Sequence, residues 1–259
     1  MITSDPKSRF SNRVEDYVRY RPGYPRAVID LLRKECGLTA DSMVADMGSG
    51  TGFLARLFLE VGNAVYGVEP NAPMREAGER LLEEFPKFRS VGGSAEETTL
   101  ADSSVDLIVA GQAFHWFDRG RCRAEFARIL RRDGWVAVVY NHRRKDSSDF
   151  AREYERILQT YGVDYHAVAE RHVDGEKMAE FFAPAKFSDA HFKNEQLFDF
   201  EGLKGRMLSS SYSPKEDHAN HPAMIEELER IFAAHEEYGY VRLEYDTQVS
   251  YGRLAASRL

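Results

Sequence analysis

Short apolar segments alternate with longer amphipathic ones through the central part of the chain. The apolar segments predict buried strands at Met43–Met47, Ala64–Val68, Phe88–Gly92, Val105–Ala110 and Trp135–Tyr140. The segments between them predict helices at Thr51–Val61, Asn71–Phe85 and Asp118–Leu130. Strands that are separated by helices pair in parallel through right-handed crossovers. The pattern therefore predicts an α/β fold around a mostly parallel sheet.

The two ends of the chain depart from this alternation. Before the first strand, an aromatic and charged stretch is interrupted at Arg21–Pro25, and its two prolines predict a helix from about Pro25 to Cys36. After Asn141 the pattern predicts helices within 147–182, at Gly202–Met207 and at Pro222–Tyr238, and strands at Lys186–Phe200 and Val241–Tyr251. We therefore expect a Rossmann-like sheet of seven strands with helices on both faces and a helical insertion late in the chain.

Composition excludes several classes of protein. The chain has 259 residues, of which 43% are hydrophobic and 30% charged, as in ordinary globular proteins. No apolar run approaches the roughly 20 residues of a membrane span, and the polar N-terminus lacks a secretion signal, so we expect a cytoplasmic protein without a membrane partner. Cys36 and Cys122 lie far apart and give no metal-ligand spacing, so no metal site is expected. The net charge of -7 argues against a nucleic-acid partner.

Three closely spaced glycines mark the strongest candidate for a ligand site. Gly48, Gly50 and Gly52 lie between the first predicted strand and its helix, at the sheet edge where α/β folds bind ligands. Glycine lets the backbone turn sharply and approach a ligand closely. Asp46 precedes these glycines, and Glu69 ends the next strand, where a carboxylate can accept hydrogen bonds from both hydroxyls of a ribose.

The spacing and charge of this segment indicate which cofactor it suits. A dinucleotide site carries its third glycine three places after the second, and here that place is Phe53. The carboxylate of Asp46 would repel a pyrophosphate, but it would attract the cationic methionine half of S-adenosylmethionine (SAM). The pattern therefore favours SAM over NAD, and it disfavours an NAD-linked oxidoreductase.

Several motifs resemble those of class I SAM-dependent methyltransferases. They are Asp46–Gly52, Glu69–Asn71 with Met74, Gly93–Glu96 and Asp106–Ile108. Arg13–Pro25 and Gln112–Phe117 resemble the subgroup around ubiquinone/menaquinone-biosynthesis and trans-aconitate methyltransferases. The resemblance covers roughly residues 8–142 and none of its motifs specifies a substrate. It implies a single methyltransferase domain over 1–259, with an N-terminal helical lid (1–40), a cofactor-binding core (41–141), and helical insertions with the final strands (142–259).

The resemblance also implies roles for individual residues around the cofactor. The methionine part and the ribose would be cradled by the glycine loop, which comprises Asp46, Gly48, Ser49, Gly50, Thr51 and Gly52. Glu69 would hold the ribose hydroxyls, and Pro70 and Met74 would flank the adenine. Ala95 and Glu96 would meet the adenine edge, Glu96 either by its carboxylate or by its backbone.

Two further groups complete the expected cofactor site. Gln112 and Ala113 would lie against the methionine moiety, after the fourth strand. Tyr17, Tyr20 and Arg21 would fold over the cofactor, with Arg21 near its carboxylate; the alternative for the tyrosines is ordinary helix packing.

The acceptor pocket is expected to begin at His115 and Trp116. His115 could take a proton from the acceptor as the methyl group moves, or it could form a wall of the pocket, which we favour. His142, Arg143 and Arg144 follow the fifth strand and could bind an acidic acceptor, although solvated loop charge is the simpler interpretation. Tyr212 lies in a polar run that is either a substrate loop or a helix end.

We therefore expect a SAM-dependent methyltransferase that acts on a small molecule, such as a carboxylate or another oxygen or carbon nucleophile, by in-line transfer. The alternative is a regulatory protein that binds SAM without catalysis. The intact Asp46, glycine loop and Glu69 favour the enzyme. The sequence specifies neither the acceptor nor the oligomeric state.

Overall fold

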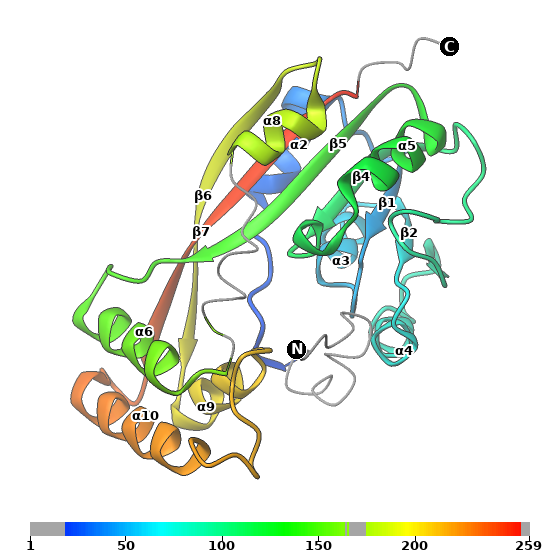
Figure 1. The fold of residues 1–259 in the computed structure, drawn as a ribbon. Coiled ribbons are helices and arrows are strands. Elements are labelled where there is room, and N and C mark those ends of the chain that lie inside the picture. The colour runs from blue at the N-terminus through cyan, green and yellow to red at the C-terminus, as the bar shows by residue number, and fades with distance from the viewer. Residues whose placement is uncertain (1–18, 164, 166–174, 255–259) are drawn as a thin grey trace.

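Seven strands form one sheet in the order β3-β2-β1-β4-β5-β7-β6 (Figure 1). The computed structural model describes residues 19–163, 165 and 175–254. The strands are β1 (Met43–Met47), β2 (Ala64–Val68), β3 (Phe88–Val91), β4 (Val105–Gly111), β5 (Leu130–Arg143), β6 (Phe187–Phe198) and β7 (Val241–Gly252). The pairs among β1 to β5 are parallel, and β7 is antiparallel to both of its neighbours. The predicted mostly parallel sheet is confirmed, including the two strands expected late in the chain.

The helices occupy the predicted segments with shifted ends. They are α2 (Ala27–Cys36), α3 (Phe53–Leu59), α4 (Ala72–Leu81), α5 (Arg119–Ile129), α6 (Asp149–Tyr161), α8 (Gly175–Phe182), α9 (Phe200–Leu208) and α10 (His221–His235), with a short 3-10 helix, η1 (Phe114–Trp116). The side chains of Asn71 and Asp118 cap α4 and α5 by accepting from the backbone nitrogens of Met74 and Arg121. Nowhere in the described part of the chain is a helix both long and apolar enough to cross a bilayer.

Two element boundaries differ from the sequence prediction for identifiable reasons. The helix α3 begins at Phe53 rather than Thr51 because Gly52 has a left-handed φ of +88° and belongs to the glycine loop. The strand β5 begins at Leu130 rather than Trp135, because Leu130 pairs with Val105 before the register shifts. The polar residues 131–133 inside this strand are exposed, and a polar run of this kind in a sequence is typical of a loop.

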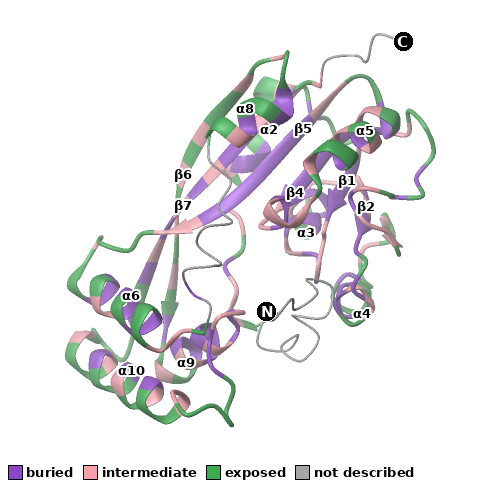
Figure 2. Cartoon of the chain, viewed as in Figure 1, coloured by how far each residue is buried: buried purple, intermediate pink, exposed green. Residues whose placement is uncertain are grey.

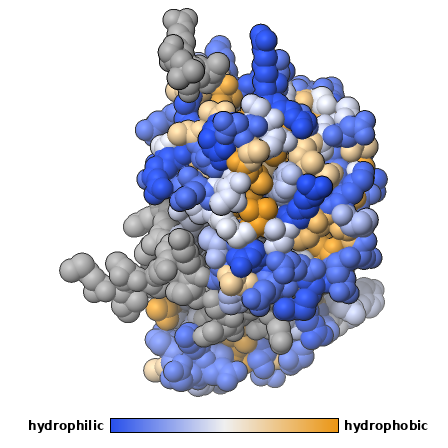
Figure 3. All heavy atoms as spheres, turned by 90° about the vertical axis from the view of Figure 1, so that its right-hand side faces the viewer, coloured by the Kyte–Doolittle hydropathy of each residue, from blue (hydrophilic) through white to orange (hydrophobic). Residues whose placement is uncertain are grey.

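Helices cover both faces of the sheet (Figure 2). Side chains of α2 and α3, such as Ile29 and Phe58, pack on one face against Val44, Val109 and other strand residues. On the other face α5 and α8 pack against a second set of strand side chains. The side of the molecule that carries α4 and α5 is largely hydrophilic at its surface, with apolar side chains gathered in a narrow patch (Figure 3). The packing of helices on both faces of the sheet fixes the carboxyl ends of β1, β2 and β4 relative to one another.

A third apolar cluster lies at the far end of the long strands. The strands β6 and β7 pair over their whole length, and their ends carry α6, α9 and α10 (Figure 1). The cluster contains Phe198, Leu243 and Tyr245 from the strands, together with Tyr154 and Leu203 from the helices. The late helices therefore pack at the ends of β6 and β7 and do not cover the face of the sheet.

Candidate functional site

The glycine loop turns sharply between β1 and α3, as expected. Gly48, Gly50 and Gly52 have φ values of +65°, +56° and +88°, in the left-handed region that favours glycine. A Cβ atom on Gly48 would lie 2.7 Å from the Cβ of Ala113. The absence of a side chain at Gly48 therefore lets the loop after β4 approach the glycine loop.

Asp46 is the most unusual group of this site. Its side chain is 1% exposed, and its Oδ2 accepts a hydrogen bond from the backbone nitrogen of Ala55 at 3.0 Å. Its Oδ1 has no partner within the residues that the structure describes. Burial raises the pKa of Asp46 to about 7, the charge of Glu69 adds to this, and the Ala55 hydrogen bond opposes it. A buried acid with one oxygen unpartnered suits a cationic ligand.

Glu69 ties the glycine loop to the start of α4. Its Oε2 accepts from the backbone nitrogen of Gly50 at 2.9 Å, and its Oε1 accepts from that of Asn71 at 2.8 Å. Burial raises the pKa of Glu69, while these two hydrogen bonds and the charge of Arg75 lower it. Met74 lies beneath the loop, since a Cβ on Gly50 would be 3.4 Å from its Cε atom. Pro70 is exposed beside them.

Replacing Glu69 by alanine is expected to lower the free energy of unfolding by about 1–3 kcal/mol, because two backbone donors lose their acceptors. Urea denaturation of the ligand-free protein measures this. Glu69→Gln is the control, since its carbonyl oxygen keeps one of the two hydrogen bonds, and it should lose about half as much. Equal stability of the wild type and the alanine variant would show that Glu69 does not hold the loop.

The loops after β3 and β4 complete the surroundings of the glycine loop. Gln112 has a φ of +54°, and its Nε2 donates to the backbone oxygen of Asn141 at 3.1 Å. Ala95 is buried, and the Oε1 of Glu96 accepts from the backbone nitrogen of Asp118 at 2.9 Å. One oxygen of Glu96 is thus engaged in joining the loop after β3 to the start of α5.

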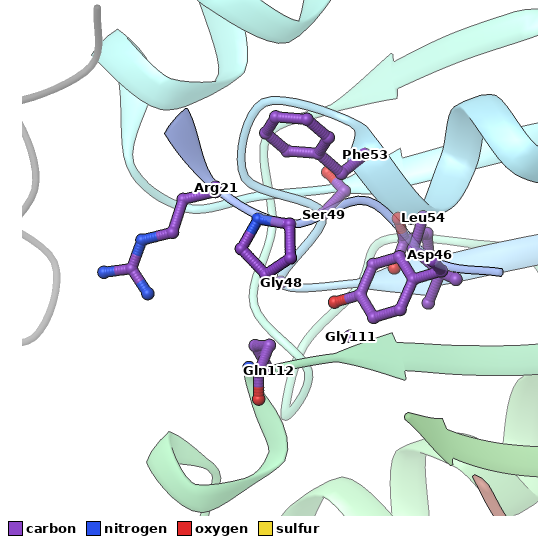
Figure 4. Close-up of a pocket in the computed structure, with 10 residues that line it drawn as sticks. Arg21, Asp46, Gly48, Ser49, Phe53, Leu54, Gly111 and Gln112 are labelled. Carbon is purple, nitrogen blue, oxygen red and sulfur yellow. The ribbon is translucent and has the colours of Figure 1, made fainter. Parts of the chain in front are cut away.

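The segment before α2 reaches the same site. Arg21 lines a pocket together with Asp46, Gly48 and Gln112 (Figure 4). Its Nη2 donates to the backbone oxygen of Ser209 at 2.9 Å, at the end of α9. Tyr20 packs against Gly205 of α9 and so contacts the third apolar cluster. Tyr17 lies outside the described residues.

Tyr24 also lines this pocket, although the sequence reasoning does not assign it to the site. A Cβ on Gly111 would lie 2.5 Å from the Tyr24 hydroxyl oxygen, so that glycine at the end of β4 makes room for the tyrosine. The signal for it in the sequence is weak, because Tyr24 is one of several aromatic residues in the same stretch.

His115 and Trp116 stand together on η1, with ring centroids 4.8 Å apart. The hydroxyl oxygen of Tyr140 accepts from the backbone nitrogen of His115 at 3.0 Å and lies 3.2 Å from its Nδ1. Burial raises the pKa of Tyr140, and its ring stacks on His142 with centroids 5.6 Å apart. Tyr140 was not anticipated; a hydroxyl-bearing residue near the carboxyl end of an apolar strand is its only sequence signal.

The remaining candidates lie at the end of β5 and after α9. The Nε2 of His142 is 3.1 Å from the Oε1 of Gln248, so this ring is held against β7. The Nη2 of Arg143 is 2.5 Å from Glu155 of α6, and Tyr212 packs edge-on against Tyr165 with centroids 4.9 Å apart. The structure therefore brings Arg143 and Tyr212 into the region of α6 and α9.

Comparison with known proteins agrees with this geometry. Residues 45–138 match the family model described as a methyltransferase domain. The Rossmann-like fold is shared with solved structures of methyltransferases. A solved structure of a provisionally assigned type II methyltransferase from Anaeromyxobacter dehalogenans is similar with a TM-score of 0.64 and 22% identity, covering 90% of this chain and 98% of that one.

Two curated relatives are also methyltransferases by name. An uncharacterized methyltransferase of Mycobacterium tuberculosis is 37% identical over 167 residues, which are 64% of this chain and 64% of that protein. An uncharacterized methyltransferase-like protein of Schizosaccharomyces pombe is 27% identical over 245 residues, or 92% of each chain. Because the second match covers 92% of this chain, it extends into the part after β5, so most of the late part of the chain also has a counterpart in a related protein.

Proposed function

We propose that this chain is a SAM-dependent methyltransferase that acts on a small-molecule acceptor by in-line transfer. The observation that carries the proposal is Asp46, a buried acid with an unpartnered oxygen at the glycine loop. The matched methyltransferase domain begins one residue before it and includes the whole loop. The names of the two relatives support the same activity. The narrower resemblance to ubiquinone, menaquinone and trans-aconitate methyltransferases stays a prediction.

The residues around the glycine loop fit SAM. When bound, SAM supplies a methyl group on a positively charged sulfur. Asp46 would attract the cationic methionine half, and Gly48 lets the loop after β4 lie close to the glycine loop on the same side of the pocket. Both oxygens of Glu69 already accept from backbone nitrogens, but each carboxylate oxygen offers a second lone pair, so both ribose hydroxyls can still be bound. The buried Thr51 Oγ1, which finds no partner in the described ranges, is a further polar atom for the ligand.

The acceptor side would be formed by η1 and the end of β5. Transfer from a sulfonium is an in-line displacement, so holding the acceptor in line and excluding water provide much of the rate. Tyr140 fixes the backbone and ring of His115, which supports His115 as a wall of the pocket rather than a mobile base. Arg21 joins the donor pocket to α9, which supports a role for the N-terminal segment in closing the site.

Calorimetric titration tests the cofactor. S-adenosylhomocysteine and SAM are expected to bind with affinities in the micromolar range, and NAD is expected to give no heat, because the carboxylate of Asp46 opposes a pyrophosphate. Binding of NAD with SAM silent would contradict the proposal. Transfer of a radiolabelled methyl group to members of an acceptor panel then separates an enzyme from a protein that only binds SAM.

A further inference from the structure

Three arginines meet where the late helices join the sheet. Arg143 ends β5, Arg206 belongs to α9, and Arg21 comes from the segment before α2. The side chain of Arg143 is 9% exposed, and Arg206 is 6% exposed. Burial of a guanidinium is costly unless an anion and hydrogen-bond acceptors accompany it.

Neutral groups surround Arg206 within the described part of the chain. Its Nε donates to the hydroxyl oxygen of Tyr245 at 3.3 Å, and its Nη1 donates to the Oγ of Ser210 at 3.1 Å. Among the described side chains no carboxylate forms an ion pair with it. Among the residues that the structure describes, its positive charge therefore has no ion-pair partner.

Arg143 has one anionic partner, which it shares. Its Nη2 lies 2.5 Å from the Oε2 of Glu155, and its guanidinium carbon lies 4.8 Å from the ring centre of Tyr154. Glu155 also pairs with Lys145 at 3.0 Å and accepts from the hydroxyl of Tyr165. The Nη1 of Arg143 is buried and donates to no atom of the residues that the structure describes. One carboxylate thus serves two cations, and a buried donor remains to be used.

Tyr212 reports the resulting positive potential. Burial by itself would raise the pKa of its hydroxyl, but the charges of Arg206 and Arg143, a hydrogen bond with Ser210 and the charge of Arg21 together lower it below the ordinary value. Tyr212 as a whole residue is partly exposed, although its hydroxyl lies in buried surroundings. This surplus of positive charge stands in a protein whose net charge is -7.

The position of this cluster relates it to the donor pocket. Arg21 lines the pocket that contains Asp46 and Gln112, and it also donates to Ser209, three residues from Tyr212. Gln112, after β4, donates to Asn141, two residues before Arg143 in β5. Residues of the donor pocket are therefore hydrogen-bonded to the strand and the helix end that carry Arg143 and Arg206.

We propose that Arg143, Arg206 and Tyr212 form a binding site for an anionic group of the methyl acceptor, a carboxylate or a phosphate. This inference rests on the proposed function, which it deepens by naming the charge of the substrate. The planar fork of a guanidinium matches both kinds of anion. When the anion binds, the Nη1 of Arg143 gains an acceptor. The anion also adds a second negative charge to that of Glu155, which is shared between Arg143 and Lys145. A neutral amide of the same shape would offer these donors an acceptor but no negative charge, so it would form only the weaker neutral hydrogen bonds.

Calorimetry on the full chain, saturated with S-adenosylhomocysteine and held at constant ionic strength, tests the site. The probes are succinate, inorganic phosphate and the neutral succinamide. At least one anion is expected to bind at least about tenfold more tightly than succinamide, a difference of about 1.4 kcal/mol. The stronger anion indicates whether the site suits a carboxylate or a phosphate. Equal binding of all three probes, or no binding of either anion, would overturn the inference.

Variants locate the binding. Arg143→Gln should lower the affinity for the more tightly bound anion at least about tenfold, since it removes a buried charge-assisted hydrogen bond. Arg144→Gln is the matched control: Arg144 is the next residue, is exposed, and lies 3.7 Å from Glu244, so its loss should change the affinity less than about twofold. Tyr212→Phe keeps every formal charge and should weaken the anion by about threefold through loss of the hydroxyl. Equal affinities in the Arg143 and Arg144 variants would place the anion elsewhere.

Two further measurements keep the outcomes separate. Should Arg143→Gln fail to fold, as judged by circular dichroism, Arg143→Lys retains the charge, and a loss of affinity there supports the planar fork of the arginine. An unchanged affinity in both Arg143→Lys and Tyr212→Phe would overturn the inference. Titration with S-adenosylhomocysteine in the absence of anions tests the proposed function by itself. Anion binding without nucleoside binding would contradict the proposed function alone, and the reverse would contradict only the anion site.

Discussion

Asp46→Asn is expected to stabilise the ligand-free protein above pH 7 by up to about 4 kcal/mol. In the folded chain the pKa of Asp46 is raised from 3.8 to about 7, so the unfolded chain releases this proton at a lower pH than the folded one. Stability therefore falls as the pH rises between these two values, by about 1.4 kcal/mol per pH unit, and stays low above them. Asparagine has no charge to bury and keeps an acceptor for Ala55.

Urea denaturation of both proteins at pH 5 and pH 8 measures this effect. The wild type should lose stability between the two values, and the variant should lose clearly less. The same substitution should weaken SAM binding at least about tenfold, because the attraction to the cationic methionine half is removed. Wild-type binding near pH 7 should also release protons, since a bound cation favours the ionised carboxylate. Identical pH profiles for the two proteins would show that Asp46 is not the titrating group.

Gly48→Ala is expected to abolish most SAM binding and to destabilise the protein more than a glycine substitution of equal backbone strain. The φ of Gly48 is +65°, and an added Cβ would lie 2.7 Å from the Cβ of Ala113, a rigid neighbour. The loop after β4 must then move away from the glycine loop. Overpacking of this kind costs about 1–3 kcal/mol, in addition to about 1–2 kcal/mol for the left-handed backbone.

Gly37→Ala is the matched control for this prediction. Gly37 has a φ of +69° at the end of α2, and a Cβ there would meet no atom within 4 Å. Its substitution therefore carries the backbone strain without the collision. The Gly48 variant should unfold at lower urea concentration than the Gly37 variant and bind S-adenosylhomocysteine at least about tenfold more weakly. Equal stability and equal affinity of the two variants would mean that the contact with Ala113 is unimportant.

Local patterns in the sequence suffice to predict the alternation of strands and helices in the first half of the chain. The apolar runs at β1, β2 and β4 are local signals, and so are the helix caps Asn71 and Asp118, whose side chains bond to nitrogens three residues away. The glycine loop was readable for the same reason, because its turn needs glycine at fixed places in a short segment. Helix and strand ends were less well predicted where a strand runs through exposed polar residues, as at 131–133 in β5, which lie between the paired residues Leu130 and Trp135.

Contacts between residues that are far apart in the sequence depend on how the whole chain packs. Arg21 and Ser209 are 188 positions apart, and no local pattern predicts their hydrogen bond. The sequence alone favours solvated loop charge for Arg143. In the structure α6 places Glu155 beside it, and α9 places Arg206 in the same region. Hydrophobic periodicity tells which side of a helix is buried, but it does not tell which partner covers it. The positive cluster therefore follows from the packing of the late helices on the long strands β6 and β7, and from no single segment of the sequence.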